Sequence, residues 1–171
     1  LGPLMARFYR EADIASLWER AQPDYDAEIA RYHEPLTRAV MEASAYLRTE
    51  TSGFLGWRFQ VFVDLLAAPH QVHTRSYGSE YFVVVTPSVE PQTNEVRHAY
   101  LHFLLDPLAT KYADTVLKYK ALGEYAQGAP FLESAFKSDF LLLASECVIK
   151  AVESRLEHSA AGRQALVNQA L

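Results

Sequence analysis

The sequence predicts an α+β domain that is mostly helical, with a small sheet of three or four largely antiparallel strands packed on one helix. Apolar residues repeat at helical spacing over residues 3–48 and again over residues 92–158. Between them, residues 58–86 alternate with a period of two and are rich in β-branched and aromatic side chains. The 171 residues suit a single domain over 1–171. Because the first residue is Leu rather than Met, we expect a fragment of a longer chain.

Composition narrows the classes of function. Asp and Glu number 21 against 16 for Lys and Arg, a net charge of -5, so a nucleic-acid partner is not expected. Membrane insertion is not expected either, because no apolar run approaches the roughly 18 residues that span a bilayer. Cys147 is the only cysteine, which excludes an internal disulfide and is typical of a small core residue.

The N-terminal part, residues 3–48, is expected to form two helices. Gln22-Pro23-Asp24 predicts a break and a restart. The second helix carries apolar residues at steps of three and four, and Pro35 in its middle predicts a kink.

Three strands are expected at residues 58–66, 70–77 and 80–86. The short turns at Ala68-Pro69 and Gly78-Ser79 favour hairpins between neighbouring strands. His70 and His73 lie in the second strand, where an odd separation places them on opposite faces and makes a shared metal improbable.

The helices that follow carry the charged residues of interest. A helix is expected over residues 94–105, with a stop and restart at Asp106-Pro107 and a further helix over 107–121. A long helix is expected over residues 130–158, with an apolar middle that contains one charge, Glu146. Residues 162–171 form either a last short helix or a frayed end.

Two histidines suggest a metal site. His98 and His102 are four residues apart, which places both imidazoles on one face of a helix, where they can share one ion. An open zinc site needs a third protein ligand, and a carboxylate from another helix can supply it. Glu146 is the best candidate, because a carboxylate in an apolar helix stays protonated or finds a cation.

Other roles for these residues remain open. Asp106 continues the face of the two histidines and is the second candidate for the third ligand, although its position before a proline also suits an N-cap. Lys150 or Arg97 could pair with Glu146 in place of a metal. The histidines and this carboxylate would then form a metal-free, hydrogen-bonded cluster in a scaffold or protein-interaction domain.

The order of these elements resembles the gluzincin branch of the zincin metallopeptidases. In that family a His-Glu-x-x-His helix gives two zinc ligands, and a Glu on a downstream helix gives the third. Residues 98–108 and 146–151 also look like the corresponding helices of uncharacterised bacterial zincin-like domains. The resemblance implies a zincin-like fold with zinc at His98, His102 and Glu146, and it favours an exported bacterial location, periplasmic or extracellular.

The resemblance also implies a partner. In the family, the strand before the His helix forms the edge along which an extended peptide substrate lies. The expected edge binds an extended peptide or protein segment and consists of Tyr81, Phe82, Val83, Val84 and Val85.

The sequence departs from the family at the general base. The Glu after the first His is replaced by Ala99, and the loss of such a base commonly costs about 10²–10⁴ in rate. We therefore expect a degenerate domain, a pseudopeptidase that keeps zinc and binds extended peptide without efficient hydrolysis. The alternative is an active peptidase, either with Ala99 as an engineered replacement or with another base such as Glu95. An oxyanion-stabilising side chain would come from Tyr100, Tyr112 or Tyr119.

Overall fold

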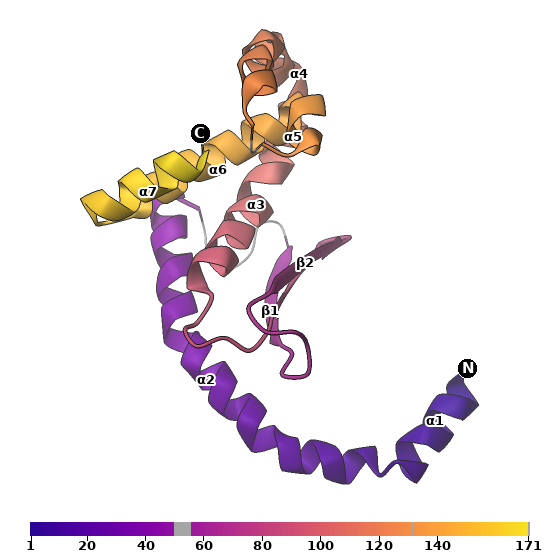
Figure 1. The fold of residues 1–171 in the computed structure, drawn as a ribbon. Helices are drawn as coiled ribbons and strands as arrows, with labels where there is room; N and C mark the ends of the chain where they lie inside the picture. The colour runs from indigo at the N-terminus through magenta and orange to yellow at the C-terminus, as the bar shows by residue number, and fades with distance from the viewer. Residues whose placement is uncertain (50–55, 131, 171) are drawn as a thin grey trace.

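The computed structural model of the protein describes residues 1–49, 56–130 and 132–170. Two helices, α1 (Gly2–Glu11) and α2 (Ile14–Leu47), form its N-terminal part (Figure 1). The predicted break at Pro23 is wrong, because α2 runs through Pro23 and Pro35 as one curved helix. The break lies earlier, at Asp13, whose φ of 48° is left-handed and ends the run of helical backbone.

The three predicted strands are present, and they form one mixed sheet. Strands β1 (Arg58–Val63), β2 (Val72–Tyr77) and β3 (Glu80–Val85) lie in the order β1-β3-β2. The β2–β3 pair is the antiparallel hairpin expected at Gly78-Ser79, but β1 pairs with β3 in parallel. The expectation of a largely antiparallel sheet is therefore correct for only one of the two pairs. The connection after β1 leads to β2, which forms the opposite edge of the sheet, and β3 then lies between β1 and β2.

The central place of β3 corrects the predicted peptide-binding edge. Both sides of this strand are already paired, one with β1 and one with β2, so its backbone cannot accept a further strand. The expected edge at Tyr81, Phe82, Val83, Val84 and Val85 is wrong. Among the described residues, the sheet ends at β1 and β2.

The helices after the sheet begin with α3 (Thr93–Lys111), which carries both histidines. The predicted stop at Asp106-Pro107 is wrong, because α3 continues through Pro107. Next come α4 (Ala113–Val116), the 3₁₀ helix η1 (Leu117–Gly128) and α5 (Ser134–Ser138). The predicted long helix is divided at Asp139, whose carboxylate accepts hydrogen bonds from two backbone N–H groups and caps α6 (Phe140–Leu156). The last helix, α7 (Ala160–Ala170), is formed.

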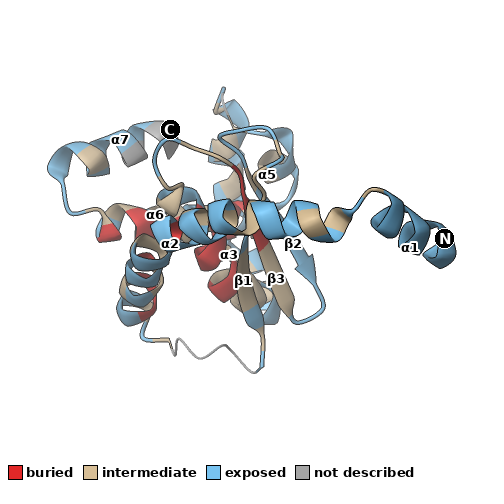
Figure 2. Cartoon of the chain, turned by 90° about the horizontal axis from the view of Figure 1, so that it is seen from below, coloured by how far each residue is buried: buried red, intermediate tan, exposed pale blue. Residues whose placement is uncertain are grey.

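The core holds α3 between the sheet and α6 (Figure 2). On one side Leu101 and Ile149 are fully buried between α3 and α6. On the other side Val83 and Val85 of β3 pack with Val96 of α3. The sheet therefore packs on the His-bearing helix, as predicted, and fixes which face of α3 is turned to α6.

Within the described part of the chain, no helix combines the length and apolar character needed to cross a membrane.

Candidate metal centre

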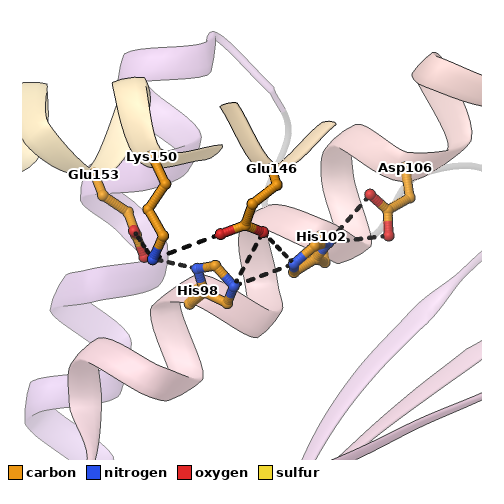
Figure 3. Close-up of polar contacts among 6 residues, drawn as sticks. All are labelled: His98, His102, Asp106, Glu146, Lys150 and Glu153. Carbon is orange, nitrogen blue, oxygen red and sulfur yellow. Dashed lines mark hydrogen bonds and ion pairs between the residues drawn. The ribbon is translucent and has the colours of Figure 1, made fainter. Parts of the chain in front are cut away.

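The packing of α3 against α6 brings the three predicted ligands together (Figure 3). The Nε2 atoms of His98 and His102 are 3.1 Å apart. Oε2 of Glu146 lies 3.6 Å from the first and 3.3 Å from the second. One ligand atom from each residue lies within 4.8 Å of the others, so a single ion could contact all three.

The other nitrogen of each imidazole contacts a second carboxylate. Nδ1 of His98 lies 3.0 Å from Oε1 of Glu153, and Nδ1 of His102 lies 3.1 Å from Oδ2 of Asp106. Because a carboxylate only accepts hydrogen bonds, each Nδ1 must carry the proton and donate it. In a neutral imidazole this leaves the lone pair on Nε2, the atom that faces Glu146. Carboxylates that fix the tautomer in this way are typical of histidine metal ligands.

Asp106 therefore orients a histidine and is neither the third ligand nor an N-cap. It lies inside α3, and the group of residues able to hold one ion contains Glu146 instead. Sequence reasoning missed the corresponding role of Glu153. A signal was present, because Glu153 is two helical turns after Glu146 and shares its face of α6.

Lys150 completes the cluster from the same face of α6. Its Nζ lies 3.6 Å from Oε1 of Glu146 and 3.1 Å from Oε2 of Glu153. This confirms the ion pair considered for Glu146 and Lys150. The other suggested cation, Arg97, instead donates a hydrogen bond to Oδ1 of Asn94.

The charges of the cluster shift its protonation. Burial alone lowers the pKa of His102, but hydrogen bonds to Asp106 and Glu146, together with their charges, raise that pKa to about 9. Burial, the largest single effect, raises the pKa of Glu146 and of Glu153. For Glu146 the hydrogen bond to His102 and the charges of His98, Lys150 and His102 together outweigh burial, so its pKa falls below the usual range. For Glu153 the hydrogen bonds and charges of His98 and Lys150 do the same. The carboxylates are thus ionised at neutral pH, as metal ligands and their orienting partners must be.

The donor set suits a divalent cation. Two imidazole nitrogens and one carboxylate oxygen are ligand atoms that zinc accepts, and three protein ligands leave a coordination position open. With both imidazoles neutral, the three carboxylates and the ammonium leave two net negative charges. A divalent ion would neutralise them.

A cleft of about 800 Å³ lies beside the histidines, and we call it the site cleft. Its walls come from the β2–β3 hairpin, from α3, α6 and α7, and from single residues that flank these elements. The lining residues are His70, Val72, Thr74, Tyr81, Gln92, Asn94, Glu95, Arg97, His98, Ala99, His102, Lys150, Glu153, Glu157, Gly162 and Ala165. Ala99 is 3% exposed and presents only a methyl group to this cleft.

The other residues considered from the sequence are distributed around the centre. Glu95 lines the site cleft, so it stays a candidate for a base. Tyr100 is buried, and its hydroxyl lies 2.9 Å from Oγ of Ser44. Tyr112 and Tyr119 are exposed and lie outside the cleft lining. The tyrosine that does line the cleft is Tyr81.

The remaining histidines and the cysteine do not belong to the cluster of His98, His102 and Glu146. His70 lines the site cleft with a left-handed φ of 61°, while His73 contacts Gln71. Cys147 is exposed rather than in the core as expected. Partial desolvation of its thiol by neighbouring atoms, together with the charge of Glu146, still raises the pKa of Cys147, which opposes a nucleophilic role.

No protein-family model, curated protein or solved structure matches this chain.

Proposed function

We propose that this protein is a zinc-binding, zincin-like domain in which His98, His102 and Glu146 hold the metal. One observation carries the proposal: both Nε2 atoms converge on one oxygen of Glu146, while each Nδ1 donates to a separate carboxylate. A bound zinc ion with an open position would act as a Lewis acid toward a carbonyl oxygen or a water molecule.

The same site lacks a general base at the position where the gluzincin motif has a glutamate. Ala99 lies between the two histidines in sequence and faces the site cleft, but a methyl group neither accepts nor donates a proton. Efficient peptide hydrolysis is therefore not part of the proposed function. An active peptidase remains the alternative if Ala99 replaces a native Glu.

We further propose that an extended peptide segment binds along β2. Val72 and Thr74 of this edge strand line the site cleft, next to the histidines. The backbone N–H of Thr86 donates to the carbonyl of Gln71, so by the alternation of an antiparallel ladder Val72, Thr74 and Ser76 direct their polar backbone groups away from β3. These groups would pair with a peptide that adds one more strand to the sheet.

A metal-free scaffold has one observation in its favour. With His102 protonated, its Nε2–H can donate to Nε2 of His98, 3.1 Å away, and Lys150 neutralises part of the acidic charge. All members of the cluster then have partners without a metal. A proton would occupy the place that zinc takes in the first proposal.

Metal content separates the two roles. We expect about one equivalent of zinc in protein purified without chelator or metal-affinity resin, measured by inductively coupled plasma mass spectrometry. His102→Ala and Glu146→Gln should lose it, because each removes one ligand. His73→Ala is the matched control, since the side chain of this exposed histidine of β2 forms a hydrogen bond with Gln71, and its removal should leave the zinc content unchanged. If the protein holds less than about a tenth of an equivalent of zinc after zinc is added, the metal proposal is wrong and the metal-free scaffold is favoured.

A further inference from the structure

Lys150 lies between two carboxylates of the candidate metal centre (Figure 3). Its Nζ is 3.6 Å from Oε1 of Glu146 and 3.1 Å from Oε2 of Glu153. The second oxygen of each carboxylate contacts an imidazole. Lys150 therefore touches a proposed metal ligand and also the residue that orients another ligand.

The helix itself brings the ammonium to this position. Lys150 follows Glu146 by four residues and precedes Glu153 by three on α6, spacings at which side chains meet on one helix face. The contacts therefore do not depend on a bound metal. The side chain of Lys150 is 33% exposed and that of Glu146 is 15% exposed, so water screens their charges only in part.

An ammonium in this place opposes a divalent cation. Both positive charges would share the carboxylate of Glu146, with Lys150 on Oε1 and the metal on the oxygen that faces the histidines. Like charges on opposite sides of one partly buried carboxylate repel each other. Without a metal, the same ammonium offsets the repulsion between Glu146 and Glu153.

We propose that Lys150 is a built-in counter-cation that lowers the affinity of the centre for its divalent ion and stabilises the centre when the ion is absent. This inference rests on the proposed function, because it concerns the same three ligands. It predicts the direction in which the metal affinity changes when Lys150 is replaced. If Lys150 only positioned Glu146 for the metal, its removal would weaken metal binding, whereas removal of a counter-cation strengthens it.

Competition with a chromophoric chelator would measure the affinity of the full chain for Zn²⁺ alone, and the direction of its change in Lys150 variants tests the inference. Lys150→Met should raise the affinity about tenfold or more, because it removes the competing charge. Lys150→Arg keeps the charge and should stay within about threefold of the wild type. An unchanged or lower affinity in Lys150→Met would overturn the inference.

Two further variants keep the test decisive. Lys118→Met makes the same change of net charge at an exposed residue of η1, and an equal rise in affinity there would also overturn the inference. If Lys150→Met does not fold, Lys150→Gln removes the charge but keeps a hydrogen-bond donor, and the same rise is expected. A wild-type chain that binds no Zn²⁺ overturns the proposed function as well. A wild type that binds Zn²⁺, with no rise in the Lys150 variants, overturns this inference alone.

Discussion

Glu153 of α6 accepts a hydrogen bond at 3.0 Å from Nδ1 of His98 on α3, and it does so while only 4% exposed. A carboxylate so deeply buried is destabilising unless charged or hydrogen-bonding partners surround it. Its partners here are His98 and Lys150. The packing of α6 against α3 therefore places Glu153 where it orients the imidazole of His98.

Glu153→Gln should lower the affinity for zinc by roughly tenfold to a hundredfold, the usual effect of losing a partner that orients a metal ligand. The amide can still accept a hydrogen bond from His98, but it lacks the negative charge that makes the imidazole a stronger ligand. Competition with a chelator would measure the change. Glu157→Gln, at the glutamate that follows directly after α6, is the control, and an equal loss there would contradict a specific role for Glu153.

Zinc should stabilise the folded protein. A ligand that binds only the folded state at a hundred times its Kd adds about 2.7 kcal/mol to the free energy of unfolding. For a domain of this size, that corresponds to roughly 5–10 °C in Tm. Thermal unfolding followed by circular dichroism, with zinc and with chelator, would measure it. The shift should vanish in His102→Ala, and a shift that persists there would place the stabilising ion elsewhere.

The cluster of His98, His102 and Glu146 could be predicted because its geometry is mostly local. Spacing by four residues on any helix places His98 and His102 side by side, and a lone charge in an apolar helix marks Glu146 as a residue in need of a partner. The role of Glu153 depends on which face of α6 turns toward α3, and that is decided by the packing of residues such as Leu101 and Ile149.

The strand order could not be predicted for a related reason. Local turn signals at Gly78-Ser79 correctly gave the β2–β3 hairpin, but they say nothing about where β1 pairs. The long-range crossover places β3 in the centre and leaves β1 and β2 as the outer strands of the sheet. Likewise, Pro107 does not end α3, because burial of the helix outweighs the loss of one backbone hydrogen bond.

Zinc binding should release a proton near neutral pH. With the pKa of His102 at about 9 in the metal-free protein, this imidazole is mostly protonated at pH 7.5, roughly one and a half pH units below that pKa. It must lose this proton to bind a metal. Titration calorimetry in buffers of different ionisation enthalpy should show release of about one proton per zinc. Asp106→Asn removes the main hydrogen bond that raises this pKa and should reduce the release. Equal proton release in both proteins would contradict the assignment to His102.

The same shift fixes the pH dependence of the metal-free protein. Because the pKa of His102 is raised from 6.5 to about 9, its contribution to stability is fully present below pH 6.5 and is lost as pH rises through 9. The lowered pKa values of Glu146 and Glu153 act in the opposite sense, since their contribution is present above pH 4.5 and is lost as pH falls. These groups therefore favour greatest stability between pH 4.5 and 6.5, with at most about 3 kcal/mol from His102. Denaturant unfolding in chelator across this range would test the trend.

Ala99→Glu should introduce peptide hydrolysis if the centre holds zinc in the arrangement that we propose. A carboxylate at this position would face the site cleft next to both histidines and could take a proton from a water molecule, a role worth about 10²–10⁴ in rate. The rate would be measured with a mixture of fluorogenic peptides on zinc-loaded protein, with and without chelator. Ala99→Gln has nearly the same volume without a base, so it separates the effect of a base from the cost of placing a larger side chain beside Val83 and Val96. If the Ala99→Glu protein is folded and loaded with zinc but hydrolyses peptides no faster than Ala99→Gln, the chain must lack other catalytic groups besides the general base. That result would favour a binding role for the wild-type domain.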